Sequence, residues 1–383
     1  MKILITNGHL QVGGVEKSLI NLLNTIDYSK NEVDLLLFEG YGEYRDLVPK
    51  EVNVILCDTT RTYGSFFSVI KKAIMKRDMR SLAMKVIFTF ANKITMRSMS
   101  LMKWFRLVTK EYDYAFAYRV GISADFVAYA VKAKVKCVWW HHGQIDNSER
   151  QMIHWKKMMK QMNRIICVSE AARNIILPYF KEYADKMIVI SNIINCKEIK
   201  QKAKLFHPYE KIEADIIKIV SVGRFSPEKH MLDTVIVLKR LIEKGYYIHW
   251  FLVGDGPERK KIEEKIHELD IVQHMTLVGK CSNPYPYIND ADIFVHPSFV
   301  ESQGLTVLEA MVLHKICVVV ESAGTNEFII NGKNAIQAEQ NIDSLTENIE
   351  YALRNKELIQ YEQQDLTIAQ FSPQKIINQI LLL

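Results

Sequence analysis

The sequence contains no long uninterrupted run of apolar residues, although 48% of its 383 residues are hydrophobic. A helix that crosses a bilayer needs about 20 mostly apolar residues in succession, so we expect no transmembrane helix. The first two residues lead directly into the strand-like segment 3–6, without the apolar stretch that marks a secretory signal. These absences predict a cytoplasmic protein.

Cysteine is scarce, and its spacing argues against metal and disulfide frameworks. No two of the six cysteines form a C-x-x-C pair, and most lie in strand-like apolar runs. Reduced and buried thiols are the simplest interpretation. Asp290 and Asp292 have the D-x-D spacing of a metal site, but they precede a predicted strand and would lie at the wrong edge of a parallel sheet. We therefore expect no metal site and no cofactor.

Acidic residues are almost missing from the segment 66–110, where eleven lysines and arginines accompany Asp78 as the single acid. The charge of this segment exceeds the net charge of +6 of the whole chain, so the remainder is net acidic. Apolar residues recur among these charges at helical spacing, which indicates a basic amphipathic surface for anionic lipid. A basic face that is simply solvated is the alternative. No recognised nucleic-acid-binding module accompanies the segment, so we expect no nucleic acid partner.

Strand-like and helix-like segments alternate along both halves of the chain. Strands are predicted at 2–6, 32–38, 52–56, 113–118, 136–140, 164–168 and 187–190, and then at 216–222, 249–253, 274–278, 293–296 and 316–320. Helices are predicted to begin near residues 15, 122, 227, 257 and 304, and another after an N-cap at Ser169. Such alternation is typical of parallel sheets covered by helices.

We therefore predict an α/β fold with two Rossmann-like, doubly wound domains. A single hydrophobic core seldom grows beyond about 250 to 300 residues, which also favours two domains in a chain of this length. The polar passage 191–215 shows no clear periodicity and is interpreted as the linker. The predicted domains are 1–195 and 196–370, and a short apolar-faced helix at 371–383 is expected to pack back on the first domain.

Turns that follow predicted strands carry the first candidate site residues. Gly13 and Gly14 open a helix, so a ligand could approach the backbone near the positive helix end. They lack the three-glycine spacing of a dinucleotide fingerprint, and a plain tight turn is the alternative. His141 and His142 come at the end of a strand, where ligands bind in open parallel sheets, although a buried histidine with satisfied hydrogen bonds is equally compatible. The glycines of a similar turn at 254–257 suit either a structural or a ligand-binding role.

The second half carries charged residues at its strand ends. Arg224 and Lys229 follow its first strand and, with free amides at a helix start, suit a diphosphate; two solvated cations are the alternative. Glu301 and Glu309 bracket a glycine where a strand gives way to a helix, and carboxylates there can accept hydrogen bonds from sugar or ribose hydroxyls. An exposed loop acid and a helix-face acid are the alternative. The amides of 302–305 would lie at a helix N-terminus, a natural anion site.

Taken in order, these motifs resemble the retaining glycosyltransferases of family four, which have the GT-B fold of two Rossmann-like domains facing a cleft. The motifs are Gly13-Gly14-x-Glu16, Trp139-x-His141, Gly223-Arg224 with Lys229, and an E-x7-E signature from Glu301 to Glu309. The likeness covers nearly the whole chain. Asn283-Pro284-Tyr285, and Ala291-Asp292 before Ser298, are similar to transferases that assemble bacterial surface polysaccharides.

The resemblance implies a role for each motif. It makes His141 and Glu301 the catalytic residues, with His142 as the alternative to His141. The other donor-binding residues would be Arg224 and Lys229 at the diphosphate, Glu309 at the ribose, and Ser302, Gln303, Gly304 and Leu305 at the sugar. Gly14 is implied as donor-binding without a more specific place. Gly13, Glu16 and His142 would lie on the acceptor side. The implied reaction is a metal-independent transfer with retention, most simply from a UDP-sugar to a saccharide.

The basic segment 66–110 would then present a lipid-linked acceptor, with the protein peripheral on the cytoplasmic face of the inner membrane and active in surface-polysaccharide synthesis. Three departures from the family pattern bear on the identity of the donor. His230 stands where a glycine is common, Ser302-Gln303 replaces a glycine–aromatic pair, and 323–325 is less glycine-rich than usual. The alternatives are a nucleotide-sugar epimerase of the same fold, which needs no acceptor, and a non-catalytic partner subunit.

Overall fold

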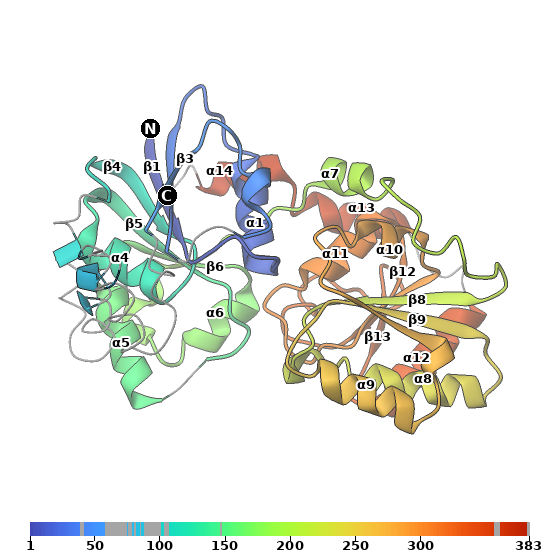
Figure 1. Ribbon diagram of the computed structural model, residues 1–383. Coiled ribbons are helices and arrows are strands. Elements are labelled where there is room, and N and C mark those ends of the chain that lie inside the picture. The colour runs from blue at the N-terminus through green and yellow to red at the C-terminus, as the bar shows by residue number, and fades with distance from the viewer. Residues whose placement is uncertain are drawn as a thin grey trace. The chain divides into compact units, whose positions relative to one another are not determined.

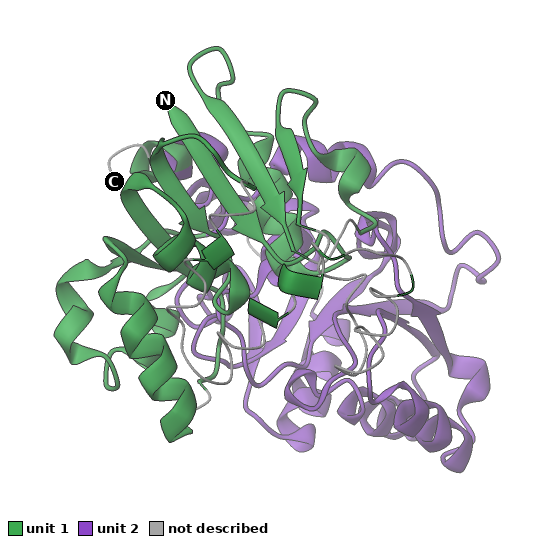
Figure 2. Cartoon of the chain, turned by 60° about the vertical axis from the view of Figure 1, so that its left-hand side comes forward, with its two compact units in different colours: residues 1–191, 377–383 green, residues 192–376 purple. Residues whose placement is uncertain are grey.

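The computed structural model describes residues 1–38, 42–57, 75, 79, 82–84, 86–87, 101–102, 107–145, 148–355 and 361–380. The chain divides into two compact units, the first made of Met1–Ser191 with Ile377–Leu383 and the second of Asn192–Ile376 (Figure 2). Each unit has its own parallel sheet accompanied by helices (Figure 1). The predicted α/β fold with two Rossmann-like sheets is confirmed.

Within its described residues, the first unit contains a seven-stranded parallel sheet. Its strands are β1 (Lys2–Asn7), β2 (Glu32–Leu37), β3 (Asn53–Leu56), β4 (Tyr112–Ala117), β5 (Ala133–Trp140), β6 (Arg164–Cys167) and β7 (Met187–Val189). The spatial order is β3-β2-β1-β4-β5-β6-β7, so the direction of winding reverses between β1 and β4. The helices are α1 (Gly14–Leu23), α4 (Ile122–Ala130), α5 (Glu149–Lys160) and α6 (Glu170–Ile176), with 3-10 turns at Arg45–Leu47 and Lys181–Lys186. The predicted cap of α6 is confirmed, because Ser169 Oγ accepts a hydrogen bond from Ala172 N at 2.9 Å.

In the described part of the second unit, six parallel strands follow the order β10-β9-β8-β11-β12-β13. They are β8 (Ile217–Val222), β9 (Ile248–Val253), β10 (Met275–Gly279), β11 (Ile293–His296), β12 (Ile316–Val320) and β13 (Ile336–Ala338). The helices are α7 (Cys196–Lys202), α8 (Asp233–Glu243), α9 (Arg259–Glu268), α10 (Tyr285–Asp290), α11 (Leu305–Val312), α12 (Ile342–Arg354) and α13 (Tyr361–Ala369), with 3-10 turns at Pro227–Lys229 and Val272–His274. The last helix, α14 (Pro373–Ile380), begins in the second unit and ends in the first, which resumes at Ile377. The winding of this sheet reverses between β8 and β11.

Alternate residues of the second sheet enter two separate cores. On β12, Val318 and Val320 pack with residues of α8, α9 and α12, whereas Cys317 and Val319 pack on the other face with residues of α7, α10 and α11. Successive strand residues point to opposite faces, so a strand covered on both faces must be apolar throughout. This is the physical reason for the continuous apolar run that predicted this strand.

The passage 191–215 is not the linker that its polar composition predicted. It contains α7, whose N-terminus is capped by the Asn195 side chain accepting from Glu198 N at 3.2 Å. Ile194, Ile199 and Tyr209 from the same passage are buried in the core of the second unit. Their spacing follows a short helix and irregular segments, so no single period was visible. The sequence prediction also missed α5, α10, α12, α13 and β13.

The helix predicted to begin near residue 227 begins at Asp233 instead. Pro227–Lys229 forms a 3-10 turn, and His230 then adopts a left-handed backbone conformation with φ of 50°. Ser226 makes no backbone cap, and its hydroxyl donates to Glu228 Oε1 at 2.6 Å. A residue in the left-handed conformation cannot continue a right-handed helix. Glycine adopts this conformation most easily, which explains why glycine suits the position that His230 occupies here.

Gly254 lies where two strand ends of the second unit approach each other closely. A Cβ at Gly254 would lie 1.8 Å from the carbonyl oxygen of Gly223, whereas one at Gly245 would have no neighbour within 4 Å. Both glycines have positive φ, of 149° and 88°. Alanine at Gly245 would therefore report only the strain of a positive φ, whereas alanine at Gly254 would add crowding against the Gly223 backbone.

We expect Gly254→Ala to prevent stable folding or to lower the thermal midpoint several times more than Gly245→Ala does. The strain at Gly245→Ala should cost about 1 kcal/mol, or roughly 2–4 °C in a unit of this size. Thermal unfolding followed by fluorescence or calorimetry measures the difference. Equal thermal midpoints for the two variants would contradict the close approach of Gly254 to the Gly223 backbone.

Candidate active site

Several of the predicted site residues lie beyond the carboxyl ends of the strands at which each sheet reverses its winding. In such sheets ligands bind at this point. In the second unit, Lys229 follows β8 and Glu301 follows β11, which are neighbouring strands. In the first unit, the loop with Gly13 follows β1, and Arg119 follows the adjacent β4. Each topology therefore gathers residues that are distant in the sequence.

Glu301 is the centre of a hydrogen-bonded cluster in the second unit. Its Oε1 accepts from Lys229 Nζ at 2.5 Å and from His296 Nε2 at 2.9 Å. The Glu301 side chain is 11% exposed. Burial alone would raise the pKa of Glu301, but the Lys229 ammonium and the hydrogen bond from His296 outweigh it and hold the pKa well below its usual range. Glu301 is therefore an ionised hydrogen-bond acceptor.

The turn that carries Lys229 is fastened to the loop that carries Glu301. The Glu228 carbonyl accepts from Ser298 Oγ at 3.2 Å and from Phe299 N at 3.3 Å. The ring of His230 stacks on Phe299, with 3.5 Å between the centroids and 13° between the planes. His230 Nδ1 also lies 2.9 Å from Asp233 Oδ2. These contacts hold the turn that carries Lys229 against the loop that carries Glu301.

The loop after Glu301 is backed closely by another loop. Gly304 has φ of 78° and immediately precedes α11, and a Cβ at Gly324 would lie 2.5 Å from the carbonyl carbon of Ser302. Only glycine permits this approach of two backbones at Gly324. The amides of the loop that ends at Leu305 therefore stand at the N-terminus of α11, in the position predicted for an anion or sugar site.

Three predicted donor-site residues differ in their exposure. Arg224 is exposed directly after β8, whereas Glu309 is 3% exposed within α11. Gln303 is also 3% exposed, and its Oε1 accepts from Asn192 N at 2.9 Å and from Asn192 Nδ2 at 2.7 Å. The side-chain oxygen of Gln303 is therefore engaged within its own unit, whereas its buried Nε2 has no hydrogen-bond partner among the described residues.

In the first unit, the predicted acceptor-side residue Glu16 is 4% exposed at the start of α1. Its Oε1 accepts from Arg119 Nη1 at 3.2 Å and lies 3.6 Å from His9 Nδ1. A Cβ at Gly13 would lie 2.5 Å from Glu16 Oε2, so a larger residue there would displace the Glu16 side chain, while Gly14 is the first residue of α1. Glu16 therefore has its charge balanced by an arginine that the sequence prediction missed.

His141 directly follows β5, and its ring lies against Tyr118 with 5.0 Å between centroids. Burial is the main cause that lowers the pKa of His141, and together with the charges of His142 and Arg119, and against a hydrogen bond with the Tyr118 backbone, it brings the pKa to about 3. Its buried Nε2 has no hydrogen-bond partner in the described residues. Burial also lowers the pKa of His142, whose carbonyl accepts from Trp140 Nε1 at 3.2 Å. His141 therefore presents a neutral imidazole.

Two functional candidates, Arg119 and His296, were missed by the sequence prediction. Both stand at or just after the end of a strand, and this position was the available signal. By contrast, Asp290 and Asp292 lie before β11, at the amino edge, as predicted. Asp292 Oδ2 accepts from Lys218 N at 2.8 Å, and Asp290 Oδ2 lies 2.9 Å from His207 Nδ1.

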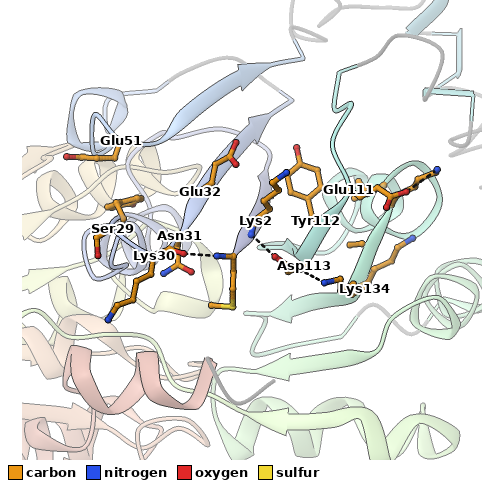
Figure 3. Close-up of a pocket in the computed structure, with 16 residues that line it drawn as sticks. Lys2, Ser29, Lys30, Asn31, Glu32, Glu51, Glu111, Tyr112, Asp113 and Lys134 are labelled. Atoms are coloured by element: carbon orange, nitrogen blue, oxygen red, sulfur yellow. Dashed lines mark hydrogen bonds and ion pairs between the residues drawn. The ribbon is translucent and has the colours of Figure 1, made fainter.

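A pocket of about 1200 Å³ lies at the other edge of the first sheet (Figure 3). It is lined by residues at the amino ends of β1, β2, β4 and β5. Several of its charged groups pair with one another: Asp113 accepts from Lys134 Nζ at 2.7 Å and from Lys2 N at 2.8 Å. Parallel sheets do not bind substrates at this edge, so we do not assign the pocket to the active site.

The predicted lipid surface at 66–110 falls mostly outside the described residues. Of its basic residues the structure describes Lys110, which contacts Glu32 and lies 3.3 Å from Asp34. None of the helices in the described part of the chain combines the length and the apolar character needed to cross a bilayer.

Two family models match consecutive parts of the chain. Residues 12–198 match Glycosyltransferase Family 4, and residues 202–365 match Glycosyl transferases group 1. The two matches correspond closely to the two units of the structure.

Curated relatives agree with these matches. A poly(ribitol-phosphate) alpha-N-acetylglucosaminyltransferase of Staphylococcus aureus is 26% identical over 223 residues, which are 56% of this chain and 42% of the relative. An uncharacterized glycosyltransferase of Methanocaldococcus jannaschii is 26% identical over 165 residues, 43% of this chain and 41% of the relative. The chain spans about half the length of the curated relatives that it matches.

Solved structures resemble the chain over its full length. Anabaena HepE in complex with UDP and glucose has a TM-score of 0.73 and 18% identity, covering 100% of this chain and 98% of that one. S. aureus TarM in complex with Fondaparinux, alpha-GlcNAc-glycerol and UDP has a TM-score of 0.74 and 15% identity, covering 99% of each chain. Since both halves match a family model and the fold is shared throughout, the chain belongs to the family 4, group 1 glycosyltransferases and has the GT-B fold.

Proposed function

We propose that the chain is a retaining glycosyltransferase that transfers a sugar from a nucleoside-diphosphate sugar to a saccharide. The observation that carries this proposal is the cluster of Lys229, His296 and Glu301 beside the N-terminus of α11. It combines a cation for a diphosphate with an ionised carboxylate for sugar hydroxyls. HepE has been solved with UDP-glucose and TarM with UDP, which supports UDP as the carrier.

On the donor side, Arg224 and Lys229 bind the diphosphate, and Gly14 is a further donor-binding residue. Negative charge grows on the diphosphate as the bond to the sugar breaks, and fixed cations and amides stabilise it. These groups provide positive charge without a metal ion. Glu309 binds the ribose, and Glu301 with the amides of 302–305 binds the sugar.

On the acceptor side, His141 contributes a neutral imidazole whose Nε2 accepts a hydrogen bond from a sugar hydroxyl near the anomeric carbon. The acceptor hydroxyl attacks that carbon on the face from which the diphosphate leaves, and its proton passes to the departing diphosphate oxygen. The configuration is therefore retained. Gly13, Glu16 and His142 border the acceptor, with Arg119 balancing the charge of Glu16.

The acceptor in this proposal is a lipid-linked saccharide in surface-polysaccharide synthesis. The support is twofold. The basic segment 66–110 suits anionic lipid on the cytoplasmic face of the inner membrane. Relatives of the chain include the poly(ribitol-phosphate) enzyme and a capsular polysaccharide biosynthesis glycosyltransferase, both of S. aureus.

Replacing the central ion pair tests the proposed reaction. We expect Lys229→Met and Glu301→Gln each to lower kcat/KM for the best UDP-sugar about 100-fold or more, since each removes a charged interaction strengthened in the transition state. Lys260→Met, at a lysine of α9 that is 86% exposed, is the matched control and should behave as wild type. UDP release is measured over a panel of UDP- and GDP-sugars with saccharide acceptors, and NMR of the product reports the anomeric configuration.

Undiminished turnover in Lys229→Met or Glu301→Gln would refute the assignment of this site. Inversion at the anomeric carbon would refute the retaining mechanism. Donor incubated without acceptor provides a further control, because an isomerised nucleotide sugar would identify an epimerase.

The protonation of His141 makes stability depend on pH. Its folded pKa of about 3 lies below the ordinary value of 6.5, so the unfolded chain binds the proton more readily. The free energy of unfolding therefore has its full value above pH 6.5. It decreases as pH falls towards the folded pKa, by at most about 1.4 kcal/mol per pH unit. Thermal midpoints between pH 7 and 4 should therefore fall less in His141→Gln than in wild type. His267→Gln, at an exposed histidine of α9, is the control; a His141→Gln profile parallel to wild type would contradict a buried neutral imidazole.

Membrane association has its own test. The purified chain should sediment with vesicles that contain anionic phospholipid at low salt and be released at high salt, because electrostatic attraction is screened by ions. Vesicles of zwitterionic lipid are the control. Equal binding to both kinds of vesicle would rule out an electrostatic surface.

A further inference from the structure

His296 occupies a fixed position between the two elements that frame the sugar-binding loop. It is the last residue of β11, and its side chain is 3% exposed. Its Nε2 lies 2.9 Å from Glu301 Oε1, and its Nδ1 lies 3.4 Å from Oγ1 of Thr306 in α11. The imidazole therefore connects a strand end, a loop carboxylate and a helix start.

The partners of His296 determine its tautomer. An ionised carboxylate can only accept hydrogen bonds, so Nε2 must carry a proton to interact with Glu301. In the neutral ring, Nδ1 is then an acceptor, and the Thr306 hydroxyl can donate to it. The hydrogen bonds run in one direction, from Thr306 through His296 to Glu301, and aim a ring N–H at the carboxylate.

A bound diphosphate competes with Glu301 for the Lys229 ammonium group, because it is the more highly charged anion. Lysine is a flexible point charge that can turn from one anion to another. A carboxylate that is only 11% exposed would then lose its charged partner at a large cost unless another donor remained. Both described bonds end on Oε1 of Glu301, so Oε2 is the oxygen that suits a sugar hydroxyl.

We propose that His296 is a positioning residue that keeps the Glu301 carboxylate oriented towards the sugar while Lys229 binds the diphosphate. The inference rests on the proposed function. It adds that sugar transfer depends on the ring N–H of His296 at the end of β11. Histidine thereby supplies the sugar subsite with a second, rigid donor that does not compete for the diphosphate.

Two amide substitutions separate this role from simple packing. The side-chain nitrogen of glutamine can replace Nε2, whereas that of asparagine reaches only the place of Nδ1. We therefore expect His296→Gln to keep kcat/KM for the UDP-sugar within about threefold of wild type, and His296→Asn to lose roughly tenfold or more, as for a buried hydrogen bond to a charged group. Comparable thermal midpoints show that both variants fold.

A double-mutant cycle gives the control. In a Glu301→Ala background the change His296→Asn should have almost no further effect on kcat/KM, because the group that it positions is gone. Equal losses in His296→Gln and His296→Asn, or an undiminished loss in the Glu301→Ala background, would overturn the inference and leave His296 a packing residue.

An independent measurement needs no turnover. The ¹⁵N signals of the His296 ring, identified by their loss in His296→Gln, should show a protonated Nε2 and a bare Nδ1 in the neutral ring. The opposite tautomer would overturn the inference whatever the activity. If the tautomer is as expected but the protein uses no nucleotide sugar, the proposed function is refuted. The hydrogen bonds from Thr306 through His296 to Glu301 would then still stand.

Discussion

The arrangement of the proposed donor side depends on one constraint: the largely buried carboxylate of Glu301 must have charged or hydrogen-bonding partners. They come from different strands, since Lys229 follows β8 and His296 ends β11. The Glu228 carbonyl and the stacking of His230 on Phe299 fasten the same two loops together. The lysine and the glutamate are therefore preorganised, which is the condition for stabilising charge without reorganisation.

Parallel topology explains why such clusters form where they do. Each sheet reverses its winding between two neighbouring strands, β1 and β4 in the first unit and β8 and β11 in the second. In open parallel sheets the loops at such positions diverge to opposite faces, and ligands bind between them at the carboxyl edge. At the amino edge of the first sheet, charged residues such as Asp113 and Lys134 pair with each other instead.

The elements that the sequence predicted well are those whose local pattern agrees with their burial. β12 is covered on both faces and is apolar at every position, so it was recognised. The passage with α7 failed because Ile194, Ile199 and Tyr209 reach the core from segments with no common period. α12 was missed although Leu345 and Ile349 have helical spacing. The helix expected near residue 227 was displaced by the left-handed conformation of His230, which the surrounding contacts impose.

By itself, the sequence determined the fold class, the two parallel sheets and the motifs whose residues are close in the chain, such as Glu301 and Glu309. These follow from periodicity and from local turn chemistry, which depend on neighbouring residues. Only the tertiary structure decided which charges meet. Lys229 and Glu301 are 72 residues apart, and Arg119 and Glu16 are 103 apart. No local pattern encodes those pairs, because they are set by which strands become neighbours in each sheet.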